Sequence, residues 1–225
     1  MDCLEGRRKM DYCVFEYHAE ISIEDARKSL VCMVHQCLEL RRPISKEAFD
    51  NTIPKLHYGT YPQRSGEDSD ASLDALHWKY SELTGQYCGC QFWSEGAKRL
   101  FEHKLLEYAN ARTPTSNDAR YVAAHLAKKT HGGQQLVHEH VFPRAELRKR
   151  LALDRDNLLA AGCLAATLER VAMGCVVLQC EHKLLKRNDC DYDNPWRRYT
   201  GKIKLAENQN WPAFQRELIV AAGLL

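Results

Sequence analysis

The sequence changes character at Gly132-Gly133, and this change constrains the fold more than any other feature. Before the glycine pair, apolar residues recur at the spacing of about three to four residues that is typical of amphipathic helices. After it come two short stretches rich in β-branched and apolar residues, 134–142 and 175–180. Such stretches favour strands. The sequence therefore predicts an α+β protein that is mostly helical.

Capping residues and apolar spacing predict helices on both sides of the glycine pair. In the first part they cover residues 22–40, 45–54, 72–85, 95–110 and 117–129, with Ser45 and Ser94 as caps. The polar, turn-rich stretch 58–70 is predicted to be a mobile loop. Later helices are expected over 144–153 and 157–171, from Glu181 onwards, and from about Pro212. We expect a helical region over 1–133 and a second module over 134–225.

Composition excludes several classes of protein. The chain has 225 residues, of which 44% are hydrophobic and 28% charged, and its mean hydropathy is −0.51. These values predict a protein with a buried core rather than a membrane or disordered protein. Residues 1–5 do not begin an apolar leader, so a cytoplasmic location is expected. The net charge of +2 means that any contact with nucleic acid would be local and mostly C-terminal.

The ten cysteines are spaced without any Cys-x-x-Cys pair. The closest pairing is Cys88-Gly89-Cys90. In a reducing compartment most of these residues are expected to be buried thiols. A structural zinc site that uses Cys88 and Cys90 is the less favoured alternative.

The string from Val137 to Pro143, Val-His-Glu-His-Val-Phe-Pro, combines two imidazoles with a carboxylate. Along a strand, His138 and His140 share one face and Glu139 takes the other, although the twist at a strand end can turn neighbouring side chains toward a common ion. A second pair, Glu181-His182, follows the second predicted strand. If the two pairs converge, one carboxylate and one imidazole can hold a metal ion while another imidazole deprotonates water, as phosphodiester hydrolysis requires.

Residues 139–143 resemble the first motif of the HNH endonucleases, also called ββα-metal or His-Me finger nucleases. The resemblance covers residues 135–190. It implies that Glu139 is a metal ligand, with His138 as a further candidate, and that His140 is the general base. The remaining ligand of the family would be Glu181 or His182, on the helix after the second strand.

The family also has a central asparagine between the base and the second strand. Asn157 has a suitable spacing from His140, yet the second predicted strand begins only at Cys175. Either Asn157 fills the catalytic position and the strand lies elsewhere, or a helical insertion separates the strands and Asn157 is an N-cap. The insertion is favoured. The paired Cys-x-x-Cys zinc knuckle of many family members is absent from the sequence.

Basic residues near these motifs are candidates for contact with a phosphate backbone. Arg144, Arg148 and Lys149 lie on the helix that follows the motif, and the alternative for them is a solvated helix face. Arg197 and Arg198 stand between Trp196 and Tyr199. This arrangement suits nucleic-acid binding, and it equally suits two aromatic rings packed on the core beside two exposed arginines.

The resulting hypothesis is an endonuclease that depends on one Mg²⁺ or Mn²⁺ ion and acts on nucleic acid, with double-stranded DNA favoured. The resemblance implies a bacterial or phage context, and a homodimer is left open. The alternative is an inactive relative or a helical interaction protein, such as a regulator in defence or counter-defence. The spatial separation of the 139–140 and 181–182 pairs distinguishes the two.

Overall fold

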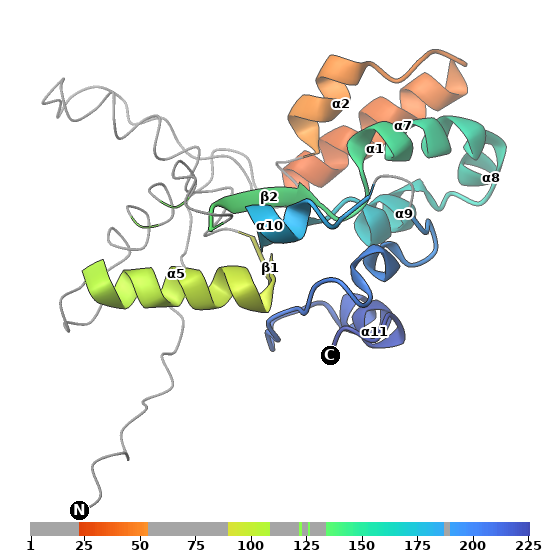
Figure 1. Ribbon diagram of the computed structural model, residues 1–225. Helices are drawn as coiled ribbons and strands as arrows, with labels where there is room; N and C mark the ends of the chain where they lie inside the picture. Colours follow the sequence, from red (N-terminus) through yellow and green to blue (C-terminus); the bar gives the residue numbers. More distant parts are fainter. Residues whose placement is uncertain (1–22, 54–89, 109–121, 123–125, 127–133, 187–189) are drawn as a thin grey trace, which may run out of the picture.

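A small mixed sheet lies at the centre of the protein. The computed structural model describes residues 23–53, 90–108, 122, 126, 134–186 and 190–225. The strands are β1 (Phe92–Trp93), β2 (Leu136–His140) and β3 (Gly174–Leu178), in the order β1-β3-β2. β3 pairs in parallel with β1 and antiparallel with β2, with Glu139 opposite Cys175 and His140 opposite Gly174. Figure 1 shows helices on both sides of these strands. The predicted α+β class is confirmed.

Three helices separate β2 from β3, so the predicted helical insertion is confirmed. They are α7 (Arg144–Leu153), α8 (Arg155–Ala160) and α9 (Leu164–Val171). The single helix expected over 157–171 is wrong, because the chain turns between α8 and α9 at Gly162, whose φ is +59°. That left-handed conformation is cheap for glycine and strained for other residues.

The helical layer at the upper right of Figure 1 contains elements from both predicted modules. Here α1 (Ile23–Glu39) and α2 (Lys46–Thr52) pack against the insertion and share a core with it. That core includes Leu30, Val34, Leu38, Phe49, Leu147, Leu151, Leu158 and Leu168, all buried. Residues from both sides of the expected boundary at 133/134 therefore share one core. β1, from the first predicted module, also pairs with β3 from the second.

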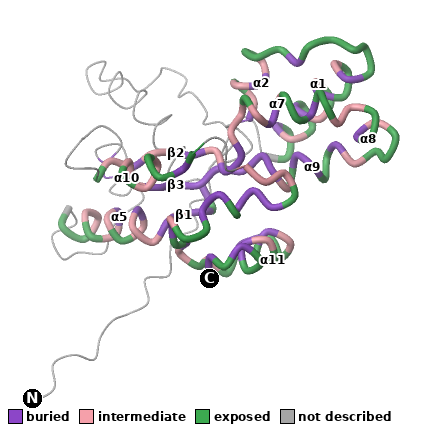
Figure 2. Tube along the Cα trace, turned by 45° about the vertical axis from the view of Figure 1, so that its right-hand side comes forward, coloured by how far each residue is buried: buried purple, intermediate pink, exposed green. Residues whose placement is uncertain are grey.

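The two faces of the sheet are covered by different helices. On one face, α5 (Glu95–Tyr108) packs Ala97 and Phe101 against Leu136 and Val176. On the other face, η1 (Pro195–Tyr199) and α11 (Ala213–Ala221) bring Trp196, Tyr199 and Ile219 against Cys175 and Val177. α10 (Gln179–His182) follows β3 directly. The burial colouring of Figure 2 shows the strands as mostly buried between these layers.

Some predictions fall on residues that the structure does not describe. The loop over 58–70, the helix over 72–85, most of the helix over 117–129 and Cys88 all lie outside the described ranges. Val122 and Leu126, the two described residues of the 117–129 segment, are buried against α5. Among the described helices, none has the length and apolar character needed to cross a membrane.

Candidate active site

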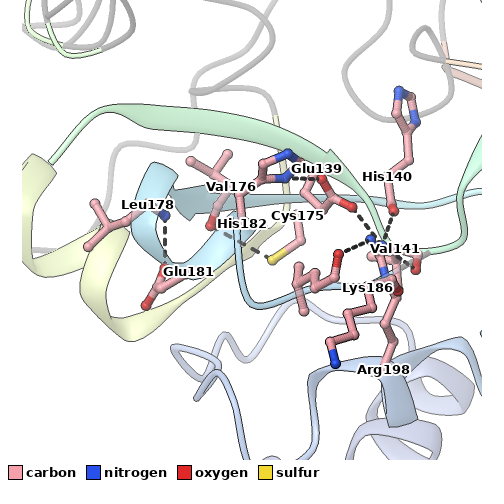
Figure 3. A network of polar contacts seen from close by, with 11 residues as sticks. Glu139, His140, Val141, Cys175, Val176, Leu178, Glu181, His182, Lys186 and Arg198 are labelled. Atoms are coloured by element: carbon pink, nitrogen blue, oxygen red, sulfur yellow. Dashed lines mark hydrogen bonds and ion pairs between the residues drawn. The ribbon is translucent and has the colours of Figure 1, made fainter. Parts of the chain in front are cut away.

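Strand alternation separates the three polar residues of the His-Glu-His string, as the sequence predicts. The rings of His138 and His140 lie on the same side of β2, with their centroids 5.4 Å apart. Glu139 is on the opposite side and is only 7% exposed. Figure 3 shows His140 pointing away from the Glu139 carboxylate. The strand end therefore does not turn His140 and Glu139 toward one point.

Both oxygens of the buried Glu139 carboxylate are engaged. Its Oε1 accepts a hydrogen bond from a terminal nitrogen of Arg198 at 2.6 Å. Its Oε2 lies 2.6 Å from Nδ1 of His182, in a close contact that is not aligned as a regular hydrogen bond. The carboxylate thus joins β2 to α10 and to η1 (Figure 3). Glu139 of the first predicted pair thus contacts His182 of the second.

Arg198 is a buried structural residue, so its predicted role in nucleic-acid binding is wrong. Its side chain is 3% exposed. Besides Glu139, its guanidinium donates to the carbonyl oxygens of His140 at 3.1 Å, Val141 at 3.4 Å, Leu185 at 3.1 Å and Lys186 at 3.1 Å. These acceptors leave no face of the guanidinium for a phosphate. They compensate the cost of burying a charge.

Packing of η1 explains why Arg198 points inward. Asn194 caps the helix by accepting from the backbone N–H of Trp196 at 3.2 Å. Trp196 and Tyr199 are fully buried, and the indole N–H donates to Gln215 at 2.8 Å. The alternative of two rings packed on the core is thus confirmed. That alternative also expects both arginines to be exposed, but only Arg197 is, and it pairs with Asp191 at 2.7 Å.

Glu181 does not join Glu139, so its prediction as the shared ligand is wrong. Its Oε2 accepts from the Ser94 hydroxyl at 2.5 Å and from the backbone N–H of Leu178 at 2.8 Å. Its carboxylate lies so close to Gly96 that a Cβ atom there would be 2.7 Å from Oε1. The fully buried Ser94 also caps α5, because its Oγ accepts from the N–H of Ala97 at 3.0 Å. Glu181 therefore fastens α10 to the start of α5.

Ser94→Ala is expected to lower the free energy of unfolding by about 2–3 kcal/mol, because it removes both a helix cap and a hydrogen bond to a carboxylate. Urea unfolding measures the change. The matched control is Ser45→Ala, which removes only the cap of α2, a bond of 3.3 Å from the N–H of Ala48. That variant should lose about 1 kcal/mol or less. Equal losses in the two variants would contradict a role for Ser94 in holding Glu181.

The histidines of β2 are held in the neutral form. Burial, with a contribution from nearby Arg144, lowers the pKa of His138 from 6.5 to about 4. Burial is also the main reason why the pKa of His140 falls from 6.5 to about 3, and repulsion from His138 when it is protonated, from Arg144 and from Arg198 adds to it. A neutral imidazole has a nitrogen lone pair that can accept a proton.

The residues that could hold a metal are fewer than the sequence predicts. Among the described residues, no three His, Cys, Asp or Glu side chains gather into one metal-binding group. Glu139 and His182 supply two adjacent donors, and the His182 side chain is 40% exposed. Mg²⁺ often takes only one or two protein ligands and fills its other positions with water and phosphate. The pair therefore offers such an ion two donors, of which His182 Nδ1 is buried and Glu139 is 7% exposed, and Arg198 places a positive charge beside them.

Cys90 does not have the environment of a zinc ligand. Its thiol is buried and donates to the carbonyl oxygen of Gly174 at 3.1 Å. Burial raises the pKa of this thiol to about 12, which keeps it protonated, whereas zinc binds the thiolate. Its predicted partner, Cys88, lies outside the described residues.

Asn157 does not lie at the Glu139–His182 pair. It is exposed within α8, where its amide donates to Asp154 at 2.8 Å. In both Figures 1 and 2, α8 lies at the outer end of the helical layer, away from α10. The alternative prediction of an N-cap is also wrong, since the cap position of α8 is Asp154.

The basic residues of α7 are partly committed to other contacts. Arg144 donates to the carbonyl oxygen of Asp50 at 3.1 Å and lies 3.8 Å from its carboxylate, which ties α7 to α2. Lys149 is exposed and pairs with Glu146 at 2.9 Å. Arg148 is half-buried. Arg144 is therefore a structural tether, while Arg148 and Lys149 remain predictions as phosphate contacts.

Sequence reasoning missed two residues that shape this site. The sequence predicts Ser94 as a helix cap, but the contact of Ser94 with Glu181 joins residues far apart in the chain. Both interpretations of the sequence place Arg198 at the surface, and only the burial of Trp196 and Tyr199 in the core shows that its side chain turns inward.

Comparisons with known protein families, with curated proteins and with solved structures found no match for this chain.

Proposed function

We propose that this protein is a metal-dependent phosphodiesterase that cleaves nucleic acid at the Glu139–His182 pair. The observation that supports the proposal is the contact of 2.6 Å between these two side chains. They come from the end of β2 and from the helix that follows β3. This is the order strand, strand, helix in which the HNH-like motif of the sequence would place two metal ligands.

The chain's own residues divide the work as follows. Glu139 and His182 would hold one Mg²⁺ or Mn²⁺ ion, which would stabilise charge on the phosphate and on the leaving oxygen. Arg198 fixes one carboxylate oxygen of Glu139, so that the other is directed at His182. The HNH-like motif implies His140 as the base, although its ring lies on the opposite side of β2 from the Glu139 carboxylate, and a separate variant tests this role. Arg148 and Lys149 are candidates for contact with the backbone.

The test is cleavage of supercoiled plasmid DNA and of RNA, with and without Mg²⁺ or Mn²⁺. His182→Ala removes one proposed ligand from a half-exposed position, and His140→Ala removes the proposed base. Each is expected to lower the cleavage rate by roughly 10²–10⁴-fold, the range typical of lost acid–base or metal-ligand groups. His103→Ala is the matched control, since it removes an exposed histidine of α5.

The variants separate the parts of the proposal. Loss of activity in His182→Ala alone would retain the site and assign the base to another group. Cleavage that is equal in all variants, or that needs no metal, would come from a different site or a contaminant and would contradict the proposal. Mn²⁺ binding, followed by the electron paramagnetic resonance of the free ion, tests the ligands without an assay of activity. We expect weaker binding in His182→Ala than in His103→Ala.

One observation favours a non-catalytic interaction protein as the second candidate. The Glu139 carboxylate is bound on one side by the Arg198 cation, and five acceptors hold that arginine in place. Such a network serves equally to join β2, α10 and η1. In that case the wild type would bind no Mn²⁺ and cleave neither DNA nor RNA, while Arg198 variants would still lose stability.

A further inference from the structure

Tyr192 lies between two arginines that come from different helices. The guanidinium carbon of Arg150, in the last turn of α7, is 5.0 Å from the centre of the Tyr192 ring. That of Arg170, in the last turn of α9, is 5.5 Å from it. The ring of Phe142 packs edge-on against Tyr192, with 5.9 Å between the centroids. We call Arg150, Arg170 and Tyr192 the Arg–Tyr cluster.

Two hydrogen-bond donors of the cluster have no acceptor. Nε of Arg170 and the hydroxyl of Tyr192 are buried atoms without a hydrogen-bond partner in the described part of the chain. Burial raises the pKa of Tyr192 to about 12, so the hydroxyl keeps its proton and acts as a donor. Buried donors are rarely left unpaired, because each costs about 1–3 kcal/mol. A ligand with several acceptor oxygens would satisfy both once the two side chains turn to expose these buried atoms.

The cluster also carries positive charge that no carboxylate neutralises directly. Within the described residues, neither Arg150 nor Arg170 forms an ion pair, whereas Arg197 pairs with Asp191. Asp154 is the carboxylate whose charge reaches Tyr192. Its Oδ1 accepts from the amide of Asn157. Two guanidiniums against one carboxylate leave the cluster with a net positive charge.

We propose that the Arg–Tyr cluster binds a phosphate group of a nucleic-acid backbone. Arginine suits this ligand because its planar guanidinium pairs with phosphate oxygens through parallel hydrogen bonds, and the tyrosine hydroxyl adds a further donor. The inference rests on the proposed function and extends it by naming a contact with the substrate away from the Glu139–His182 pair. The sequence motifs assign no role to any of these three residues.

The place of the cluster in the fold suits such a contact. Phe142, which supports Tyr192, follows His140 by two residues. Arg170 lies at the end of α9, just before β3 begins at Gly174. Arg170 and the ring that supports Tyr192 therefore lie close in the chain to the start of β3 and the end of β2, where His140 lies. A nucleic-acid backbone bound by the cluster would extend past the end of β2. The cluster would then contact a different phosphate from the one that is cleaved.

The test is binding of a fluorescein-labelled DNA duplex, measured by anisotropy over a series of salt concentrations in EDTA, so that no cleavage occurs. The variant Arg150→Gln/Arg170→Gln removes both positive charges. Loss of this one phosphate contact in the double variant is expected to weaken binding roughly eightfold at about 0.1 M salt and to reduce the log–log salt slope by about 0.9. The matched control is Arg216→Gln, which removes an exposed arginine of α11 that pairs with Glu207.

Tyr192→Phe gives a further distinction, because it keeps the ring and removes only the hydroxyl. It is expected to weaken binding a few-fold, on the order of one hydrogen bond, with the salt slope unchanged, since no charge is lost. Far-ultraviolet circular dichroism checks the folding of each variant. If the double variant does not fold, the single variant Arg150→Gln, at an exposed position, carries the test with half the change in slope.

An unchanged affinity and slope in a folded Arg150→Gln/Arg170→Gln protein, or no DNA binding by the wild type, would overturn the inference. The outcome is separable from that of the proposed function. DNA binding that depends on the arginines, without metal-dependent cleavage, would contradict the proposed nuclease activity and support the phosphate site. Cleavage that depends on His182, with DNA binding that does not depend on either arginine, would support the nuclease activity and contradict the phosphate site.

Discussion

Replacing Arg198 with methionine is expected to lower the free energy of unfolding by about 3–5 kcal/mol. The reason is that Glu139 would remain buried without its main cation, and an uncompensated buried charge is among the most destabilising changes known in proteins. Four backbone carbonyls would lose their donor as well. Urea unfolding at neutral pH, followed by circular dichroism, measures the loss.

Two further variants show where this loss comes from. Arg197→Met changes the neighbouring arginine, which is exposed and pairs with Asp191, and should cost about 1 kcal/mol or less. In Glu139→Gln/Arg198→Met the buried charge is removed together with its partner, so the double variant should be less destabilised than the sum of the single variants. A loss below about 1 kcal/mol in Arg198→Met would mean that the pair is not buried in solution.

Acidification from pH 7.5 to pH 5 is expected to destabilise the protein by about 2 kcal/mol for each of His138 and His140. Their pKa values in the folded protein, about 4 and about 3, lie below the ordinary value of 6.5. The unfolded chain therefore binds more protons than the folded one below pH 6.5. This stability is fully present above pH 6.5 and is lost as the pH falls toward the folded pKa values.

The measurement compares unfolding free energies at the two pH values in the wild type, in His138→Gln and in His140→Gln. Glutamine is neutral at both pH values, so each variant should lose about 2 kcal/mol less than the wild type on acidification. His103→Gln, at an exposed position of α5, serves as the control and should behave like the wild type. A wild type that is equally stable at both pH values would show that these imidazoles are open to protonation.

The elements of the C-terminal part follow closely from local sequence. The helix predicted over 144–153 has the same bounds as α7, because Pro143 starts it and the apolar residues Leu147 and Leu151 both face the core. The strand predicted over 175–180 overlaps β3, although the last two of its residues belong to α10. The turn at Gly162 between α8 and α9 is not predicted, since a glycine within an alanine- and leucine-rich stretch is also compatible with a continuous helix.

The candidate site was predictable only in part. Alternation along β2 places His138 and His140 opposite Glu139, and this follows from the geometry of any strand. The meeting of Glu139 with His182 was one of two pairings that the motifs allowed, and Glu181 was the other. The choice depends on Ser94, which draws Glu181 to the start of α5. A partner that lies some tens of residues away in the chain leaves no local signal.

The sequence by itself determined the class of the fold, the positions of most helices and strands, and the alternation of the His-Glu-His string, because these depend on contacts between near neighbours in the chain. Only the tertiary structure decided which charged side chains are buried and which partners they meet. Arg198 and Arg197 are adjacent arginines with the same intrinsic properties, yet one is enclosed by five acceptors and the other lies in solvent. Burial depends on how η1 packs between α11 and the sheet, a property of the whole fold.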